Sequence, residues 1–146
     1  KGATVEDNTE FVRKCVRYGI KPKVFTQVGL PGETFDSVET LARWLERMAG
    51  EGLVDADVTI TTPTAGTPLY EQAEKWLASG LIAFNLAELH SNAESLNYKG
   101  TPGQYKSFVW NQHMSRDDIV RARDMAERRF RKAARLPALV GGKDDG

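Results

Sequence analysis

The amino-acid sequence predicts an α/β fold in which parallel strands alternate with helices. Over residues 1–82, segments with apolar residues at helical spacing alternate with short runs rich in β-branched residues, in the order helix, strand, helix, strand, helix. The connections between these segments are only a few residues long, which favours right-handed crossovers between parallel strands. Because so few parallel strands leave edges and faces uncovered, we expect this region to belong to a larger sheet or to pair with a copy of itself.

The first helix is predicted over about residues 5–18. Thr4 precedes an acidic first turn, which suits the positive end of the helix dipole, and Gly19 follows the last apolar position. The next run, residues 23–28, is short and rich in β-branched and aromatic side chains, and the turn-forming residues 29–32 follow it. This pattern predicts a strand that ends in a tight turn.

A second helix and a second strand repeat this pattern. Asp36 and Glu39 have the spacing of a capping box, and apolar residues then lie on one helical face as far as Gly50. Residues 56–62 again combine β-branched side chains with a turn signal at their end. They predict a second strand parallel to the first.

The third helix is predicted to start with Thr67 as its N-cap and Pro68 as its first helical residue, and to end at Gly80. Residues 83–114 are rich in Asn, Ser, Gly and Pro, and only residues 107–110 resemble a strand. We therefore expect an irregular connection between the α/β region and the C-terminal part of the chain.

A long C-terminal helix is predicted over residues 115–136. Ser115 and Asp118 have the spacing of a capping box, apolar residues form one stripe, and Pro137 ends the helix. Residues 137–146 are expected to form a disordered tail. We expect the arginines of this helix to form a solvated face: Arg121, Arg123, Arg128, Arg129 and Arg131.

The composition excludes several classes of function. Twenty Lys and Arg residues balance 20 Asp and Glu residues, so we expect no nucleic-acid partner. No apolar run approaches the roughly 20 residues that cross a bilayer, and no secretory signal opens the chain, so we expect a cytoplasmic protein that binds no membrane. Cys15 is the only cysteine, and alone it cannot hold a zinc ion or an iron–sulfur cluster. His90 and His113 have no Glu or Cys at ligand spacing, so we expect structural or surface roles for them.

The most informative feature is that both predicted strands end in similar loops. Residues 29–34 (GLPGET) and 62–68 (TPTAGTP) each lead into a helix. In parallel α/β folds, ligands lie at the carboxyl ends of the strands, where loops and helix N-termini present free backbone N–H groups. We therefore expect the two loops to be neighbours on one ligand-facing rim.

These loops resemble a known family. Residues 28–34 after an apolar strand, followed about thirty residues later by residues 62–70, look like the C-terminal half of a radical S-adenosylmethionine (SAM) barrel. The likeness is strongest to Fe–S oxidoreductases that carry an upstream cobalamin-binding domain, and residues 1–6 match the Lys-Gly element that often opens the helix before this strand. The resemblance covers residues 1–82 and, more loosely, residues 115–131.

The resemblance implies a C-terminal fragment of a partial (βα)6 TIM-like barrel with parallel strands, followed by a mostly helical C-terminal extension. In the family, a three-cysteine loop in the N-terminal half of the barrel binds a [4Fe–4S] cluster that holds SAM. This chain lacks CxxxCxxC, so the resemblance implies no catalytic residue and no metal ligand in it, and no activity or tight cofactor binding when it is isolated. The implied partner is the missing N-terminal half of the barrel. Cobalamin is a further possible cofactor, and the substrate is a small molecule or a peptide.

The resemblance also assigns site residues. It implies that the ends of the two strands contact the adenosine side of SAM, with Gln27 near the adenine and with the backbone of residues 61–63 facing the base. For Glu33 two roles stay open, a carboxylate that stabilises the helix N-terminus or a ligand contact. The candidate cofactor-binding residues are Gln27, Gly29, Pro31, Gly32, Glu33, Thr61, Thr62, Pro63 and Gly66.

Two other hypotheses compete with this one, and the family resemblance itself leaves oxidoreduction and methyl transfer open. In the first, Gly32 and Gly66 place helix N-termini against a phosphate, although no Lys follows either glycine. In the second, the chain is a non-catalytic interaction module that completes its sheet by homodimerisation and docks its basic C-terminal helix on a partner.

Overall fold

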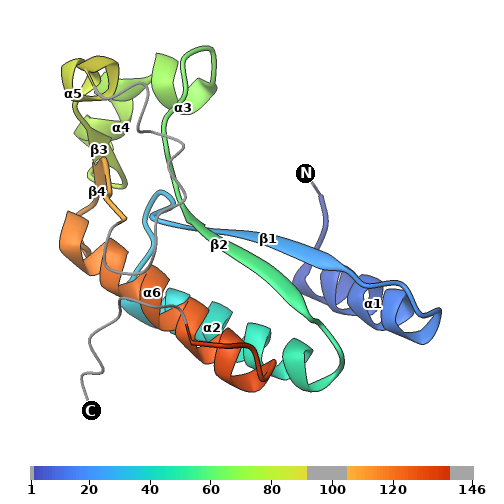
Figure 1. Ribbon diagram of the computed structural model, residues 1–146. Coiled ribbons are helices and arrows are strands. Elements are labelled where there is room, and N and C mark those ends of the chain that lie inside the picture. Colours follow the sequence, from blue (N-terminus) through green and yellow to red (C-terminus); the bar gives the residue numbers. More distant parts are fainter. Residues whose placement is uncertain (1, 92–104, 139–146) are drawn as a thin grey trace.

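The computed structural model describes residues 2–91 and 105–138, and its first elements follow the predicted order (Figure 1). Most of the predicted tail, residues 139–146, lies outside the described residues. The chain begins with α1 (Val5–Arg17), β1 (Lys23–Val28), α2 (Phe35–Gly50) and β2 (Asp55–Ile60). It continues with α3 (Pro68–Glu71), α4 (Ala73–Ser79), β3 (Ala83–Phe84), α5 (Leu86–Ser91), β4 (Val109–Trp110) and α6 (Arg116–Ala133).

The strands β1 and β2 pair in parallel, as predicted. Their register runs from Lys23 opposite Asp55 to Val28 opposite Ile60. In Figure 1, α2 and α6 lie side by side along one face of this sheet, and the short elements α3 to α5 with β3 and β4 gather at the carboxyl end of the strands. The fold is thus a mixed α/β arrangement with a small parallel sheet and a helical C-terminal part.

The core lies between the sheet and the paired helices α2 and α6. Their facing side chains are fully buried, and each contributes about 1.5–3 kcal/mol by leaving water. The largest of these side chains are Leu45, Met48, Ile119 and Phe130. This packing fixes α6 beneath β2, far along the chain from the strand that it covers.

The cap of α2 differs from the prediction. The N-cap is Thr34, whose hydroxyl accepts the Ser37 N–H at 3.2 Å, while the Thr34 N–H donates to the Ser37 hydroxyl at 3.0 Å. The predicted pair does not form because the helix begins earlier, which leaves Asp36 in the first turn and lets Glu39 pair with Arg43. The predicted capping box of Ser115 and Asp118 is present at the start of α6.

The region that was predicted as irregular contains short regular elements. Within residues 83–114, β3 and β4 pair in antiparallel fashion, with Ala83 opposite Trp110 and Phe84 opposite Val109, and α5 follows β3. The predicted third helix is divided into α3 and α4 at Gln72. Strands of two residues are too short to produce a periodic pattern, and apolar contacts between distant segments hold them together instead.

The expectation of a solvated arginine face on α6 is wrong for Arg123. Its side chain is only 3% exposed, its Nε donates to the Val58 carbonyl at 2.8 Å, and it forms ion pairs with Asp124 and Glu127. Its guanidinium also lies 3.7 Å from the Tyr105 ring centroid. Arg123 is buried because a strand carbonyl at the edge of the sheet requires a donor.

The other arginines of α6 divide into two groups. Arg121 and Arg128 are exposed, as expected. Arg129 and Arg131 are half-buried and pair with carboxylates; Arg129 reaches Glu46 on α2 at 2.5 Å. No helix in the described ranges is long and apolar enough to span a membrane.

Candidate functional site

The ends of β1 and β2 lie next to each other, as the parallel arrangement predicts. The Thr61 N–H donates to the Val28 carbonyl at 2.8 Å, so the chain leaves both strands at neighbouring points. Gly29 follows β1 with a φ of 86°, and a Cβ on it would lie only 3.1 Å from Val109 and 3.2 Å from Ile119. Glycine is therefore required here by a tight turn and by a close approach of α6 and β4.

The carboxylate of Glu33 accepts hydrogen bonds from the backbone of its own loop, residues 29–34. Its Oε2 accepts the Gly29 N–H at 2.5 Å and the Leu30 N–H at 3.3 Å. Burial raises the pKa of Glu33, and the two backbone hydrogen bonds oppose part of that rise. The Asn111 side chain reaches in from the segment after β4 and donates to the Glu33 carbonyl at 2.9 Å. Glu33 therefore holds the loop in shape.

The second loop, residues 62–68, has the same kind of hydrogen bond between a glycine N–H and a carboxylate. The Gly66 N–H donates to Oε1 of Glu71 at 3.1 Å, just as the Gly29 N–H donates to Glu33. In both loops, a carboxylate of the chain already accepts a glycine N–H group that an anion would need. The phosphate hypothesis concerned Gly32 and Gly66: the Gly66 N–H is occupied by Glu71, and the Gly32 N–H donates to the Leu81 carbonyl, so both observations weigh against it.

Polar side chains lie on the face of the sheet opposite α2 and α6. Gln27 is exposed there and stands opposite Thr59 in the register. Thr61 continues this row, and its Oγ1 is buried without a hydrogen-bond partner in the described residues. A buried hydroxyl without a partner is costly and suits a site that receives a polar ligand atom.

The remaining predicted residues surround these strand ends at different depths. Pro31 is exposed on the first loop, and the Gly32 N–H donates to the Leu81 carbonyl at 2.7 Å. Thr62 is half-buried and Pro63 is buried beside Thr61, whereas Gly66 is exposed and has open space around its α-carbon. The structure thus brings the residues nearest the strand ends together and leaves Gly66 apart from them.

The described residues do not fit an iron–sulfur cluster. Among them, no group of three His, Cys, Asp or Glu side chains lies close enough to hold a metal ion. Cys15 is buried on α1, and the ring nitrogens of the histidines meet neutral partners: His90 meets the Tyr70 hydroxyl, and His113 meets the Gln112 amide at 3.1 Å. The ligands of a cluster would therefore have to come from outside the described residues.

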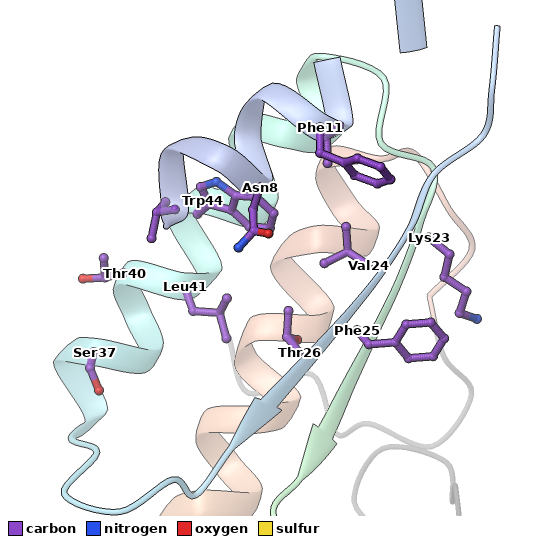
Figure 2. A pocket seen from close by; sticks show the side chains of 12 residues that line it. Asn8, Phe11, Lys23, Val24, Phe25, Thr26, Ser37, Thr40, Leu41 and Trp44 are labelled. Atoms are coloured by element: carbon purple, nitrogen blue, oxygen red, sulfur yellow. The ribbon is translucent and has the colours of Figure 1, made fainter. Parts of the chain in front are cut away.

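A groove of about 600 Å³ lies between α1, β1 and α2 and was not predicted from the sequence; it is here called the α1–β1–α2 groove (Figure 2). Its walls are mainly apolar. Figure 2 shows Val24 of β1 and Leu41 of α2 pointing into the space between these elements. Its rim includes Phe11 and Phe25, which are 62% and 70% exposed. Large apolar side chains at positions that do not face the core were the available signal for this groove.

Comparisons with protein-family models, with curated proteins and with solved structures found no match for this chain. The geometry of the strand ends and of the sheet is therefore what bears on the function of the chain.

Proposed function

We propose that this chain is the C-terminal part of a cytoplasmic radical SAM enzyme, an Fe–S oxidoreductase or methyltransferase, and that it contributes adenosine-side contacts and one wall of the substrate cavity. The carrying observation is the pair of parallel strands whose carboxyl ends adjoin, each followed by a loop of the family's type over residues 29–34 and 62–68. Ligands of parallel α/β folds bind at this end of the strands.

The two sides of the sheet support the same proposal. One face is covered by α2 and α6, while the other carries Gln27, Thr59 and Thr61 beside an exposed Phe25. Polar side chains in this position suit the inner wall of a barrel. The outer edge of β2 is capped by Arg123, which suits the last strand of a partial barrel. No residue of the described ranges caps the outer edge of β1 in this way.

Within this proposal the residues have distinct roles. Gln27 and Thr61, on the face opposite α2 and α6, supply an amide and a hydroxyl for the adenosine, and Glu33 is a positioning residue that fixes the loop after β1. The cluster and any cobalamin are held by parts of the enzyme beyond this chain. In the whole enzyme, SAM held at the cluster would supply a 5′-deoxyadenosyl radical or, in cobalamin-dependent members, a methyl group.

The test begins with the coding sequence upstream of the Lys1 codon. We expect an open frame that encodes CxxxCxxC, and we expect the longer protein, reconstituted without oxygen, to show cluster absorbance and reductive SAM cleavage. In that protein, Gln27→Ala and Thr61→Val should weaken SAM binding, while Thr40→Val, on the exposed side of α2, should not. An upstream frame without this cysteine motif, or an immediate start codon, would contradict the proposal.

A non-catalytic interaction module is the second candidate function. The observation that favours it is the group of exposed apolar side chains near the free edge of β1, which include Val5, Phe11 and Phe25. If the chain completes its sheet by homodimerisation, light scattering should give a mass that rises with concentration toward twice that of the monomer. A constant monomer mass at all concentrations would reject it.

A further inference from the structure

The helix α1 lies at one side of the molecule and turns most of its surface to solvent (Figure 1). Its buried side chains are Thr9, Val12 and Cys15. The Thr9 hydroxyl accepts the Trp44 Nε1–H at 2.9 Å, which fixes this side of the helix toward α2. The opposite side of α1 therefore faces away from the rest of the described chain.

One row of side chains on this outer side has the spacing of a helix–helix contact. Asp7, Phe11, Lys14 and Tyr18 follow one another at intervals of four, three and four residues, which places them in a narrow row along the helix. Phe11 is 62% exposed and Tyr18 is 77% exposed. Two aromatic side chains seven residues apart are thus left in water on one face of a helix, which is typical of a surface that binds a partner.

The charges of α1 indicate which partner fits this row. The N-terminal half of the helix is acidic and the C-terminal half is basic: Glu6, Asp7 and Glu10 are followed by Arg13, Lys14 and Arg17. A second α1 that runs antiparallel would place acidic residues against basic ones, and the two helix dipoles would also attract each other. On α6 the same polarity accompanies an apolar stripe that is already buried, whereas on α1 it accompanies exposed aromatic side chains.

The row and its flanks agree on one register across a twofold axis. When Phe11 lies beside Lys14 of the second copy, the ring contacts the apolar stem and the ammonium group, next to the α1–β1–α2 groove. In the same register Glu10 comes close to Arg17 of the second copy, on one flank of the row. Twofold symmetry forms each of these contacts twice.

We propose that the outer row of α1, which consists of Asp7, Phe11, Lys14 and Tyr18, is an interface that binds a second copy of α1 in antiparallel orientation. This dimer uses helix side chains and leaves the strand edges free, unlike a dimer that completes the sheet. It does not depend on radical chemistry, so a failure of SAM binding in the longer protein would leave it unaffected. Two helices of 13 residues bury less than a standard interface, so we expect a dissociation constant on the order of 100 µM.

Charge exchange tests the orientation, with the dissociation constant measured by sedimentation equilibrium. Glu10→Lys and Arg17→Glu should each raise it by about tenfold, because each variant places like charges together in both symmetric pairs. The double variant Glu10→Lys/Arg17→Glu restores opposite charges and should return to within about twofold of the parent value. An equimolar mixture of the two single variants should form a heterodimer of similar affinity.

Two matched variants test the aromatic part of the interface. Phe11→Ser should weaken the dimer by at least about tenfold, whereas Leu77→Ser, at a 58% exposed position on α4, should leave it unchanged. A constant monomer mass up to about ten times the expected dissociation constant, or a double variant as weak as the single ones, would overturn the proposal. So would a dimer that ignores the charge changes and slows amide exchange at Phe25 and Gln27, because that dimer would pair through β1.

Discussion

The two edges of the parallel sheet differ in how well the rest of the chain covers them. On the β2 side, α6 packs against α2, and Arg123 satisfies the outward strand carbonyl. On the β1 side, α1 buries only Thr9, Val12 and Cys15 and leaves a groove. The difference teaches that one half of the sheet is stabilised by packing within the chain, whereas the other half leaves a groove and exposed apolar side chains.

The two sides of the sheet should also differ in the free energy that is needed to open them. The β2 side combines large buried side chains with a buried ion-pair network, so its opening should require nearly global unfolding. The β1 side depends on a few contacts of α1: the Thr9–Trp44 hydrogen bond and an exposed ion pair between Arg13 and Glu51. Exposed ion pairs add little stability, so α1 should open more readily than α6.

The largest expected effect is at Phe130, in the centre of the β2 side. Phe130 is 1% exposed, so Phe130→Ala should lower the free energy of unfolding by about 3–5 kcal/mol in urea titrations. The matched control is Phe11→Ala on the β1 side, where the ring is 62% exposed. That change should cost less than about 0.5 kcal/mol, and equal losses in the two variants would refute the comparison.

The second effect concerns the edge cap. Arg123→Met should cost about 3 kcal/mol or more, because it leaves Asp124 and Glu127 buried beside each other and the Val58 carbonyl without its donor. The matched control is Arg128→Met, on the exposed side of the same helix, which should change the unfolding midpoint little. If both variants unfold at the same urea concentration, Arg123 does not close the edge.

The third effect is local to α1. Thr9→Val removes the hydroxyl that accepts the Trp44 indole N–H and should weaken the attachment of α1 by about 1 kcal/mol. Amide exchange should then accelerate in α1 but stay unchanged in α6. Acceleration of equal size in both helices would mean that α1 opens only when the whole chain unfolds.

The sequence predicted several features that depend on neighbouring residues, although it placed the cap of α2 at Asp36 instead of Thr34. The strand over residues 23–28 and the capping box of Ser115 and Asp118 follow from local pattern and are confirmed. The burial of Arg123 could not be predicted from its helix, because its reason is the carbonyl of Val58, a residue on a strand far away in the sequence. Hydrophobic periodicity places arginine on the solvated side and contains no information about an unpaired strand edge.

Part of the candidate site could also be predicted from the sequence. The repeated loop pattern correctly predicted that the strand ends adjoin, since parallel strands bring their carboxyl ends together. It did not predict that Glu33 would accept the Gly29 N–H, because this contact requires the positive φ of Gly29 and the packing of Val109 and Ile119 against it. A carboxylate after a turn has the same sequence signature whether it faces a ligand or its own backbone.

The smallest and sharpest expected effect separates two carboxylates, Asp118 at the start of α6 and Glu33 after β1. Hydrogen bonds from Ser115 and Arg121 lower the pKa of Asp118 from 3.8 to about 2, so its contribution to stability is present above pH 3.8 and is lost as the pH falls toward 2. Burial raises the pKa of Glu33, so its contribution has the opposite sign: stability is favoured below pH 4.5 and is lost as the pH rises through the folded-state value.

Urea titrations across this pH range should therefore give opposite profiles for the two amide variants. Asp118→Asn should destabilise the chain fully above about pH 4, and this effect should shrink as the pH falls toward 2. Glu33→Gln keeps an oxygen for the Gly29 N–H and removes a buried charge, so its stability relative to the parent chain should rise with pH. If Glu33→Gln instead loses stability as the pH rises, the ionised carboxylate of Glu33 is stabilised by the hydrogen bonds of its loop, as the carboxylate of Asp118 is stabilised at the start of α6.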